Sequence, residues 1–431
     1  MTAHSDPGAC GPSFRSTRLD CGLEVITEQL PWIRSAALGL AYRVGSRDDP
    51  AGMAGLAHFF EHMVFKGTAE LSAREISVRS ESLGAELNAF TDKELTVFYG
   101  RCPADTRRAT TELLAEIVAR PAFSPAEVLK EQAVIAEEIR STDEDPDSRS
   151  LNLTLEALYP VGPLGWPVAG TLESVSGLGV PDLSRLYPER YHCGSGLVVI
   201  TGDVDHDELV AVVASRLSSQ AAIDLPDRAP AAVGPATVLS SRRDELSQAH
   251  VCLAWPTVGY ADERRFALSV LNNTLGGGVS SRLFQRLRED EGLVYSISSF
   301  TELYADTGLL AIHFVTDRRR LERCLSVLAE ELACFRQELV NREEFDRALN
   351  MTRSSVLLSL ESPTSRMLRI ARTRHLLGRI VTAEETLAAY SRLTLDDVNA
   401  MVETAFDGQR PRVGAVGPLP TEELSRLVDE L

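Results

Sequence analysis

The sequence predicts an α+β fold made by tandem duplication of one α/β unit of roughly 200 residues, each unit a mainly antiparallel sheet layered with helices. The first observation is that residues 171–217 and 382–431 share one order of elements: a helix, an Asp-capped helix, a short loop, a Val-rich strand, a Gly turn and an amphipathic helix. The second is that residues 87–117 are echoed by 296–332, each a strand hairpin, a polar turn with Asp and a long helix with apolar residues at spacings of three and four. The third is that strands and helices are interleaved without strict βαβ alternation.

A segment between the repeats has the composition of a linker. Residues 218–241 are rich in Ala, Pro and Ser and have no apolar period. We therefore expect a first domain over 14–217, a hinge linker over 218–241 and a second, homologous domain over 242–431. A chain of 431 residues is long enough for two or three domains.

Composition narrows the classes of function. Hydrophobic residues make up 44% and charged residues 25%, which is typical of a soluble globular protein. The formal net charge of −18 argues against nucleic acid as a main partner. It could favour basic peptides, although a solvated acidic surface is the commoner explanation. No apolar run approaches ~18 residues and the N-terminus has no apolar signal region, so we expect neither a membrane span nor secretion.

The seven cysteines are scattered and never spaced C-x-x-C. This pattern is typical of reduced thiols in a cytoplasmic protein, not of a disulfide framework or a cysteine-ligated zinc.

The first element with chemical content is a helix expected from about Met53 to Phe65, between a glycine-rich approach and "KGT". His58 and His62 are four residues apart and share a helix face, so both imidazoles could bind one metal ion. Glu61 lies close to that face, free to act on a metal-bound water. The alternative is that both histidines are hydrogen-bonded residues at a helix–sheet seam.

A catalytic zinc usually has three protein ligands, so a third must come from elsewhere. A helix expected over 124–146 carries Glu131 and Glu138, which are seven residues apart and occupy one face. Such a pair is commonly only a solvated stripe. The remaining histidines stand alone in sequence, with no second His or carboxylate at ligand spacing: His4, His192, His206, His250, His313 and His375.

Three segments together carry a resemblance: "YRVGSRDDPAGMAGLAHFFEHMVFKGT", "LNAFTDKELTVFYG" and "EQAVIAEEI". They resemble the pitrilysin, insulinase and mitochondrial processing peptidase family, the inverzincins. The resemblance implies that Zn²⁺ is bound by His58, His62 and Glu138, which lies 76 residues after His62. It further implies that Glu61 is the general base and that Glu131 supports the site through a ligand.

Two further segments match substrate-binding parts of the family. In "LGGGVSSRLFQRLREDEGLVYSI" the resemblance implies that Arg288 anchors a substrate carbonyl and that Tyr295 donates to the oxyanion. Taken alone, this segment would be an amphipathic helix ending at Gly292, followed by a strand. The strand carrying Asn88, Ala89 and Phe90 resembles the one that holds substrate backbone, by pairing with an extended peptide. The second repeat has no histidine in residues 261–277, so the metal is expected only in the first.

These matches predict a zinc-dependent endopeptidase that hydrolyses unfolded peptides or processes a precursor or leader peptide inside a closed chamber. Zinc lowers the pKa of water from 15.7 to roughly 7, and Glu61 would take the proton and pass it to the leaving amine. The resemblance implies that one chain is half of a clamshell closed by dimerisation, as a homodimer or as a heterodimer with a homologous subunit. The alternatives are a non-catalytic scaffold or partner subunit of a heterodimeric processing peptidase, and a zinc enzyme of another reaction class.

Overall fold

The computed structural model describes residues 13–217, 223, 226–406 and 409–428. It divides into two compact units. The first contains Met1–Ile139, Pro167–Ala229 and Ser359–Val381, and the second contains Arg140–Trp166, Pro230–Leu358 and Thr382–Leu431.

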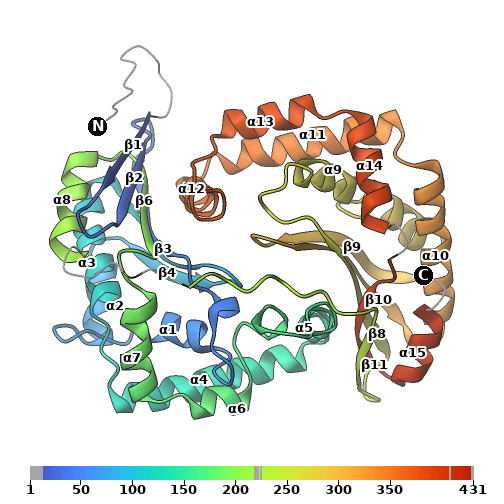
Figure 1. Cartoon of the computed structure of the whole chain (residues 1–431), viewed down its shortest axis with the longest axis horizontal. Coiled ribbons are helices and arrows are strands. Elements are labelled where there is room, and N and C mark those ends of the chain that lie inside the picture. The colour runs from blue at the N-terminus through green and yellow to red at the C-terminus, as the bar shows by residue number, and fades with distance from the viewer. Residues whose placement is uncertain (1–12, 218–222, 224–225, 407–408, 429–431) are drawn as a thin grey trace. The chain divides into compact units, whose positions relative to one another are not determined.

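Two helices belong to a unit other than the one their sequence position suggests. Helix α5 (Pro146–Leu158) packs on the strands of the second unit, and α12 (Pro363–Leu377) packs on those of the first (Figure 1). The compact units therefore differ from the linear division into 14–217, 218–241 and 242–431, which stays a prediction of where the repeats lie. Part of the expected linker falls outside the described residues, and its last residues belong to strand β7 (Val238–Arg242).

The first unit contains a six-stranded sheet in the order β1-β2-β6-β3-β5-β4. Strands β2 and β6 are parallel, and every other neighbouring pair is antiparallel. The strands are β1 (Ser13–Arg18), β2 (Glu24–Gln29), β3 (Ser35–Tyr42), β4 (Glu86–Thr91), β5 (Thr96–Pro103) and β6 (Gly196–Gly202).

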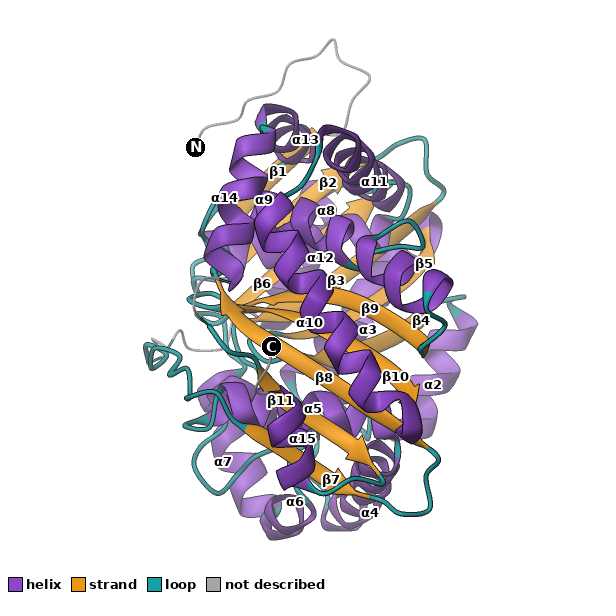
Figure 2. Cartoon of the chain, turned by 90° about the vertical axis from the view of Figure 1, so that its right-hand side faces the viewer, coloured by secondary structure: helices purple, strands orange, loops and turns teal. Residues whose placement is uncertain are grey.

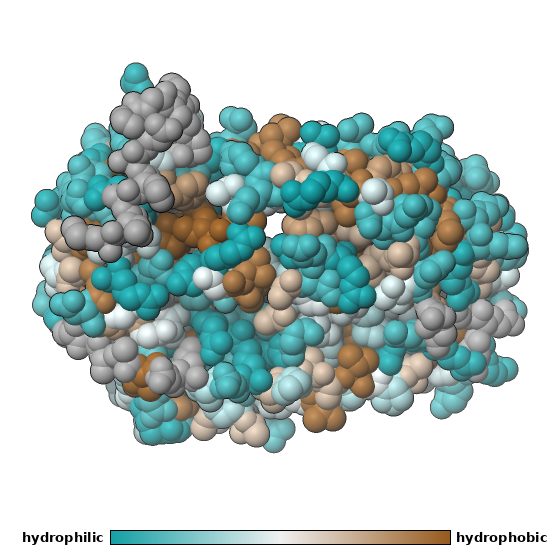
Figure 3. All heavy atoms as spheres, turned by 45° about the horizontal axis from the view of Figure 1, so that its top comes forward, coloured by the Kyte–Doolittle hydropathy of each residue, from teal (hydrophilic) through white to brown (hydrophobic). Residues whose placement is uncertain are grey.

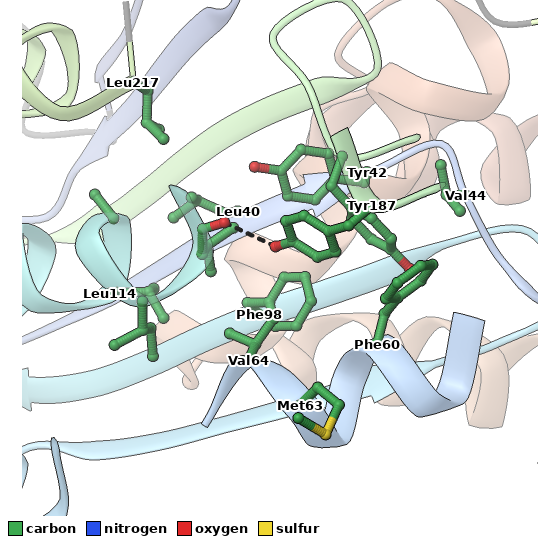
Figure 4. Packing of buried hydrophobic residues seen from close by; sticks show 14 of the residues in the cluster. Leu40, Tyr42, Val44, Phe60, Met63, Val64, Phe98, Leu114, Tyr187 and Leu217 are labelled. Carbon is green, nitrogen blue, oxygen red and sulfur yellow. Dashed lines mark hydrogen bonds between the residues drawn. The ribbon is translucent and has the colours of Figure 1, made fainter. Parts of the chain in front are cut away.

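Helices cover both faces of this sheet. Successive side chains of a strand point to opposite faces, and apolar residues lie on both faces, so both must be covered. One face, with Leu38, Leu40 and Tyr42 of β3, packs against most helices of the unit (Figure 4). The other face, with Ala37 and Ala41, packs against α12. The helices of the first unit are α1 (Leu56–Val64), α2 (Ala73–Ser82), α3 (Arg107–Ala119), most of α4 (Pro125–Glu144), α6 (Leu172–Gly177), α7 (Val180–Arg190), α8 (His206–Leu217) and α12.

The second unit repeats this arrangement. Its five-stranded sheet has the order β7-β11-β8-β10-β9, with β7 and β11 parallel and the other pairs antiparallel. This order matches β2-β6-β3-β5-β4 strand for strand, which agrees with the duplication and the mainly antiparallel sheets expected from the sequence. The further strands are β8 (Gln248–Thr257), β9 (Val294–Leu303), β10 (Gly308–Asp317) and β11 (Arg412–Gly417).

The two faces of the second sheet are also covered by helices. Leu253 and Trp255 of β8 lie on the face covered by α9, α10, α14 and α15 (Figure 2), whereas Cys252 and Ala254 lie on the face covered by α5. The helices of this unit are α5, α9 (Arg265–Leu275), α10 (Leu321–Glu338), α11 (Arg342–Ser359), α13 (Ala383–Arg392), α14 (Leu395–Phe406) and α15 (Thr421–Val428). A π-helix, η4 (Phe284–Asp290), precedes β9.

The surface seen in Figure 3 is largely hydrophilic and is interrupted by small apolar patches. Across the described residues, no helix is both long and apolar enough to cross a membrane.

Candidate metal centre

Helix α1 is a short helix with one fully buried side. Phe59, Phe60 and Met63 are 0% exposed, which fixes the helix against the sheet and leaves the other side for polar groups. The helix starts at Leu56, after Gly55, whose φ of 90° is accessible to glycine at little cost. It is therefore shorter than the helix expected from Met53, because the chain before Leu56 forms turns.

Asp49 holds the start of α1. Its carboxylate accepts hydrogen bonds from the backbone N–H of Gly55 at 2.9 Å and of Ala57 at 3.0 Å, satisfying donors that a helix start leaves unpaired. Burial raises the pKa of Asp49 to about 7.

The two histidines of α1 converge on one carboxylate of α4. Nε2 of His58 lies 3.6 Å from Oε1 of Glu138, and Nε2 of His62 lies 3.5 Å from Oε2. The ligand atoms of these three residues all lie within 4.8 Å of one another. Ligands at 2.0–2.1 Å from a tetrahedral zinc are separated by about 3.3 Å, so the three groups fit one such ion with small adjustments.

Glu131 contacts the opposite nitrogen of His62. Its Oε2 lies 3.1 Å from Nδ1 of His62, and its Oε1 lies 2.8 Å from Nζ of Lys66. Glu131 is only 4% exposed, so Lys66 supplies the positive charge that its buried carboxylate needs. A proton on Nδ1 donated to Glu131 leaves the lone pair of Nε2 directed at the metal position.

The protonation states also suit a metal site. Burial, together with nearby His62, lowers the pKa of His58 to about 4, so this imidazole is neutral at physiological pH. Hydrogen bonding from His62 lowers the pKa of Glu138, which keeps it ionised. For His62, burial acts to lower the pKa, but the hydrogen bonds to Glu138 and Glu131 outweigh it and raise the pKa. A bound cation would displace the proton that these carboxylates attract.

Glu61 lies beside the metal ligands on α1. Burial raises the pKa of its carboxyl group, although hydrogen bonds from Thr91 oppose the shift. Thr91 ends β4, which contacts α1 and lies at the edge of its sheet. An edge strand presents unpaired backbone groups to another chain. On this strand Asn88 is engaged locally, since its Oδ1 accepts from the N–H of Ala89 at 2.8 Å.

Arg288 and Tyr295 lie together in the second unit. Arg288 belongs to the π-helix η4, and its guanidinium lies 5.8 Å from the ring centroid of Tyr295 on β9. Tyr295 is 71% exposed although it is a large aromatic residue. The sequence indicated an ordinary helix here, and the π-helix is a departure of a kind that is frequent at functional sites.

Comparison with known proteins places the chain in a family. A family model described as "Insulinase (Peptidase family M16)" matches residues 24–172, and one described as "Peptidase M16 inactive domain" matches 178–352. An uncharacterized zinc protease of Streptomyces coelicolor is 35% identical over 424 residues, covering 97% of this chain and 92% of the relative. This chain belongs to peptidase family M16. The resemblance found from sequence motifs is thereby confirmed.

Other relatives of this M16 chain have similar names. An uncharacterized zinc protease of Mycobacterium tuberculosis is 36% identical over 418 residues, covering 96% of this chain and 95% of the relative. An uncharacterized zinc protease of Bacillus subtilis is 32% identical over 387 residues, which cover 89% of this chain and 94% of the relative.

Solved structures share the M16 fold. A peptidase M16 inactive domain from Pseudomonas fluorescens matches with a TM-score of 0.87 at 20% identity, covering 95% of this chain and 99% of that one. A protease from Helicobacter pylori matches with a TM-score of 0.86 at 21% identity, covering 94% of this chain and 100% of that one. A chain of Complex III2 from Candida albicans matches with a TM-score of 0.83 at 19% identity, covering 96% of this chain and 99% of that one. At these identities the likeness establishes the fold and not the activity.

Sequence reasoning missed several residues of this M16 centre. Lys66 lies in the turn that follows α1, two residues after its last residue Val64, so helical periodicity alone did not place it beside Glu131. Asp49 and Thr91 are placed by the turn before α1 and by the sheet edge, for which the sequence has no direct signal. The expectation that His250 and His313 stand alone is wrong in space, since both lie within ligand distance of Asp147.

Proposed function

We propose that this M16 chain is a zinc-dependent endopeptidase that hydrolyses unfolded peptides or processes a precursor or leader peptide. The observation that carries the proposal is the convergence of His58 and His62 Nε2 on Glu138, with the carboxyl of Glu61 adjacent on the same helix. These three ligands would hold the zinc ion. When bound, the ion supplies a Lewis acid that acidifies water and polarises a peptide carbonyl.

Glu61 would move the proton. Its carboxylate accepts a proton from the attacking water at an oxygen and later gives it to the nitrogen of the leaving amine. The raised pKa favours this role, because a carboxyl group nearer to neutral pH is both a stronger base and easier to reprotonate. The hydrogen bonds from Thr91 hold the group in place between the two transfers.

The substrate would bind in extended form. Edge strand β4 supports pairing of a peptide with Asn88, Ala89 and Phe90 through backbone hydrogen bonds, which read little sequence. Following the family resemblance, Tyr295 would donate its hydroxyl proton to the developing oxyanion and Arg288 would bind a substrate carbonyl. Exposure of the Tyr295 side chain is compatible with this contact.

Assembly and location follow the same resemblance. We propose a homodimer that closes a chamber around the peptide, since one chain carries both the zinc motif and the Arg288–Tyr295 segment. A heterodimer with a homologous subunit is the alternative arrangement. A cytoplasmic location is supported by the scattered spacing of the cysteines, which is typical of reduced thiols and not of a disulfide framework.

The test compares two glutamates of α4. Glu138→Ala should remove one equivalent of zinc per chain and abolish internal cleavage of an unstructured peptide, as followed by elemental analysis and mass spectrometry of the products. Glu127→Ala, which loses only an exposed ion pair with Lys130, is the matched control and should retain both. Unchanged cleavage by Glu138→Ala would contradict the proposed centre. A zinc-loaded wild-type protein that cleaves no peptide would favour the non-catalytic partner subunit.

A further inference from the structure

A second group of potential metal ligands lies in the second unit. His250 is on β8, His313 is on β10, and Asp147 is in the first turn of α5. In the antiparallel register His313 faces Cys252, and His250 faces Val315. The two histidines are therefore diagonal neighbours on one face of the sheet, at a separation that long side chains can bridge.

Helix α5 brings the carboxylate to this face. Leu155 and Leu158 pack with Cys252 and Ala254 in one apolar cluster, which fixes the helix across the strands. The helix also approaches β11 closely: a Cβ on Gly414 would lie 2.2 Å from the carbonyl oxygen of Ser150. Packing along α5 thus determines where its first turn, with Asp147, meets the histidines.

His250 and Asp147 are hydrogen-bonded directly, so this pair must separate to about 3.3 Å to share an ion, whereas His313 already lies at that separation from Asp147. Oδ1 of Asp147 lies 2.5 Å from Nδ1 of His250 and 3.3 Å from Nε2 of His313, and the three ligand atoms lie within 4.8 Å of one another. Nε2 of His313 is buried and has no hydrogen-bond partner among the residues that the structure describes, although it lies close to the carboxylate. A buried polar atom without a partner is costly, and a shared cation would satisfy it.

We propose that Asp147, His250 and His313 form a second metal site, for a divalent transition ion of the zinc class. Two imidazole nitrogens and one carboxylate are a ligand set that suits such ions. The Asp147 side chain is 57% exposed, so an ion can enter from solvent and complete its coordination with water. Binding at Nδ1 of His250 requires the tautomer that carries its proton on Nε2.

The role of this site is structural. A bound ion ties the first turn of α5 to β8 and β10, and it binds only the folded arrangement of the three elements. The site uses no residue of the His58–His62–Glu138 centre, so the two proposals stand or fall separately.

The experiment removes two ligands of the His58–His62–Glu138 centre and measures the metal that the protein still binds. In the full-length His58→Ala/His62→Ala protein, stripped with chelator and loaded with Co²⁺, we expect about one ion per chain and the visible absorption of a nitrogen–oxygen cobalt site. Adding Asp147→Asn or His313→Ala should abolish both signals. Asp143→Asn changes a carboxylate of similar exposure outside the group and should leave them intact.

Thermal unfolding gives an independent readout. Zn²⁺ should raise the Tm of the His58→Ala/His62→Ala protein and leave that of the added Asp147→Asn variant unchanged. Because Asp147 is largely exposed, its substitution leaves the core packing intact. Absence of cobalt from the His58→Ala/His62→Ala protein at a tenfold excess of metal, or full cobalt occupancy after Asp147→Asn, would overturn the proposal.

Discussion

The imidazole of His62 lies between two carboxylates, and this arrangement decides which nitrogen is available to a metal ion. Glu131 contacts Nδ1 and Glu138 faces Nε2. Lys66 contacts Glu131 from the other side at 2.8 Å, and this ion pair fixes the position of the buried carboxylate. Glu131 is thus a positioning residue, acting on the proposed zinc through the ring of His62.

Glu131→Gln should weaken zinc binding by 10–100-fold, the range for removing a partner of a ligating histidine. The amide keeps the size of the side chain but loses the charge that orients His62 and pairs with Lys66. The measurement is competition for zinc with a chromophoric chelator, using Glu127→Gln on the same helix as the control. Equal zinc affinities for Glu131→Gln and wild type would refute the positioning role.

At the residue scale, the sequence could predict groups on one helix but not groups on neighbouring strands. His58 and His62 are linked by helical periodicity, and Glu131 and Glu138 by two turns of α4. His250 and His313 are 63 residues apart, and their proximity depends on the register of β8 against β10, which no local pattern specifies. Glu138 was connected to the histidines through the family resemblance and not through its own spacing.

Among the elements, α12 shows how a helix late in the chain can complete an early sheet. Met367 and Ile370 are 0% exposed against the face of the first sheet that the other helices leave uncovered. Arg366 and Arg374 pair with Glu28 and Glu24 of β2, with 2.6 Å and 2.7 Å between the charged atoms. At its end, Nε2–H of His375 donates to the carbonyl oxygen of Ala41 at 3.1 Å.

This contact predicts a dependence of stability on pH. Burial lowers the pKa of His375 to about 4 in the folded state, against about 6.5 in the unfolded chain. Above pH 6.5 both states are neutral and the full stability is present; between pH 6.5 and 4 only the unfolded state takes up the proton, so stability falls as pH falls. Above pH 6.5 the lowered pKa of His375 contributes on the order of 2 kcal/mol to the free energy of unfolding, a figure reduced to allow for the partial exposure of the ring.

His375→Gln should reduce this dependence, because the amide can still donate to Ala41 but does not titrate. The measurement is the free energy of unfolding by denaturant at pH 7 and pH 5 for both proteins. The loss of stability between these pH values should be smaller in His375→Gln. An equal loss in both proteins would show that His375 does not contribute.

At the scale of elements, the sequence predicted which segments form strands and helices better than it predicted where they pack. The strand orders of the two sheets follow the expected repeats. The placement of α5 and α12 could not be predicted, because an apolar helix face specifies that it is covered and not by which sheet. The π-helix around Arg288 was also missed, since its apolar spacing differs little from that of an ordinary helix.

For the whole molecule, the duplication raises the question of what the second unit contributes. It repeats the sheet order of the first but has no counterpart of the histidine pair, and it carries Arg288 and Tyr295 instead. If this unit only supports the fold, changes around Arg288 and Tyr295 should affect neither zinc binding at the His58–His62–Glu138 centre nor catalysis. If Tyr295 stabilises the oxyanion, loss of one hydroxyl should slow the reaction.

Tyr295→Phe should lower kcat by roughly 10²–10³, the range for losing one oxyanion donor, with zinc content unchanged. Arg288→Ala should raise KM more than it lowers kcat. The control is Leu287→Ala, which is 0% exposed and should lower the Tm by creating a cavity, at a cost of about 2–5 kcal/mol. A kcat for Tyr295→Phe equal to that of wild type would leave the second unit without a catalytic role.

The most direct test of zinc-dependent peptide hydrolysis is the turnover of an unstructured peptide by metal-replete Glu61→Gln. Glutamine preserves the shape of the side chain and leaves His58, His62 and Glu138 unchanged, but it cannot accept a proton. We predict zinc content equal to wild type, retained peptide binding and a loss in kcat of at least ~100-fold. Wild-type turnover by Glu61→Gln at full zinc occupancy would contradict the account.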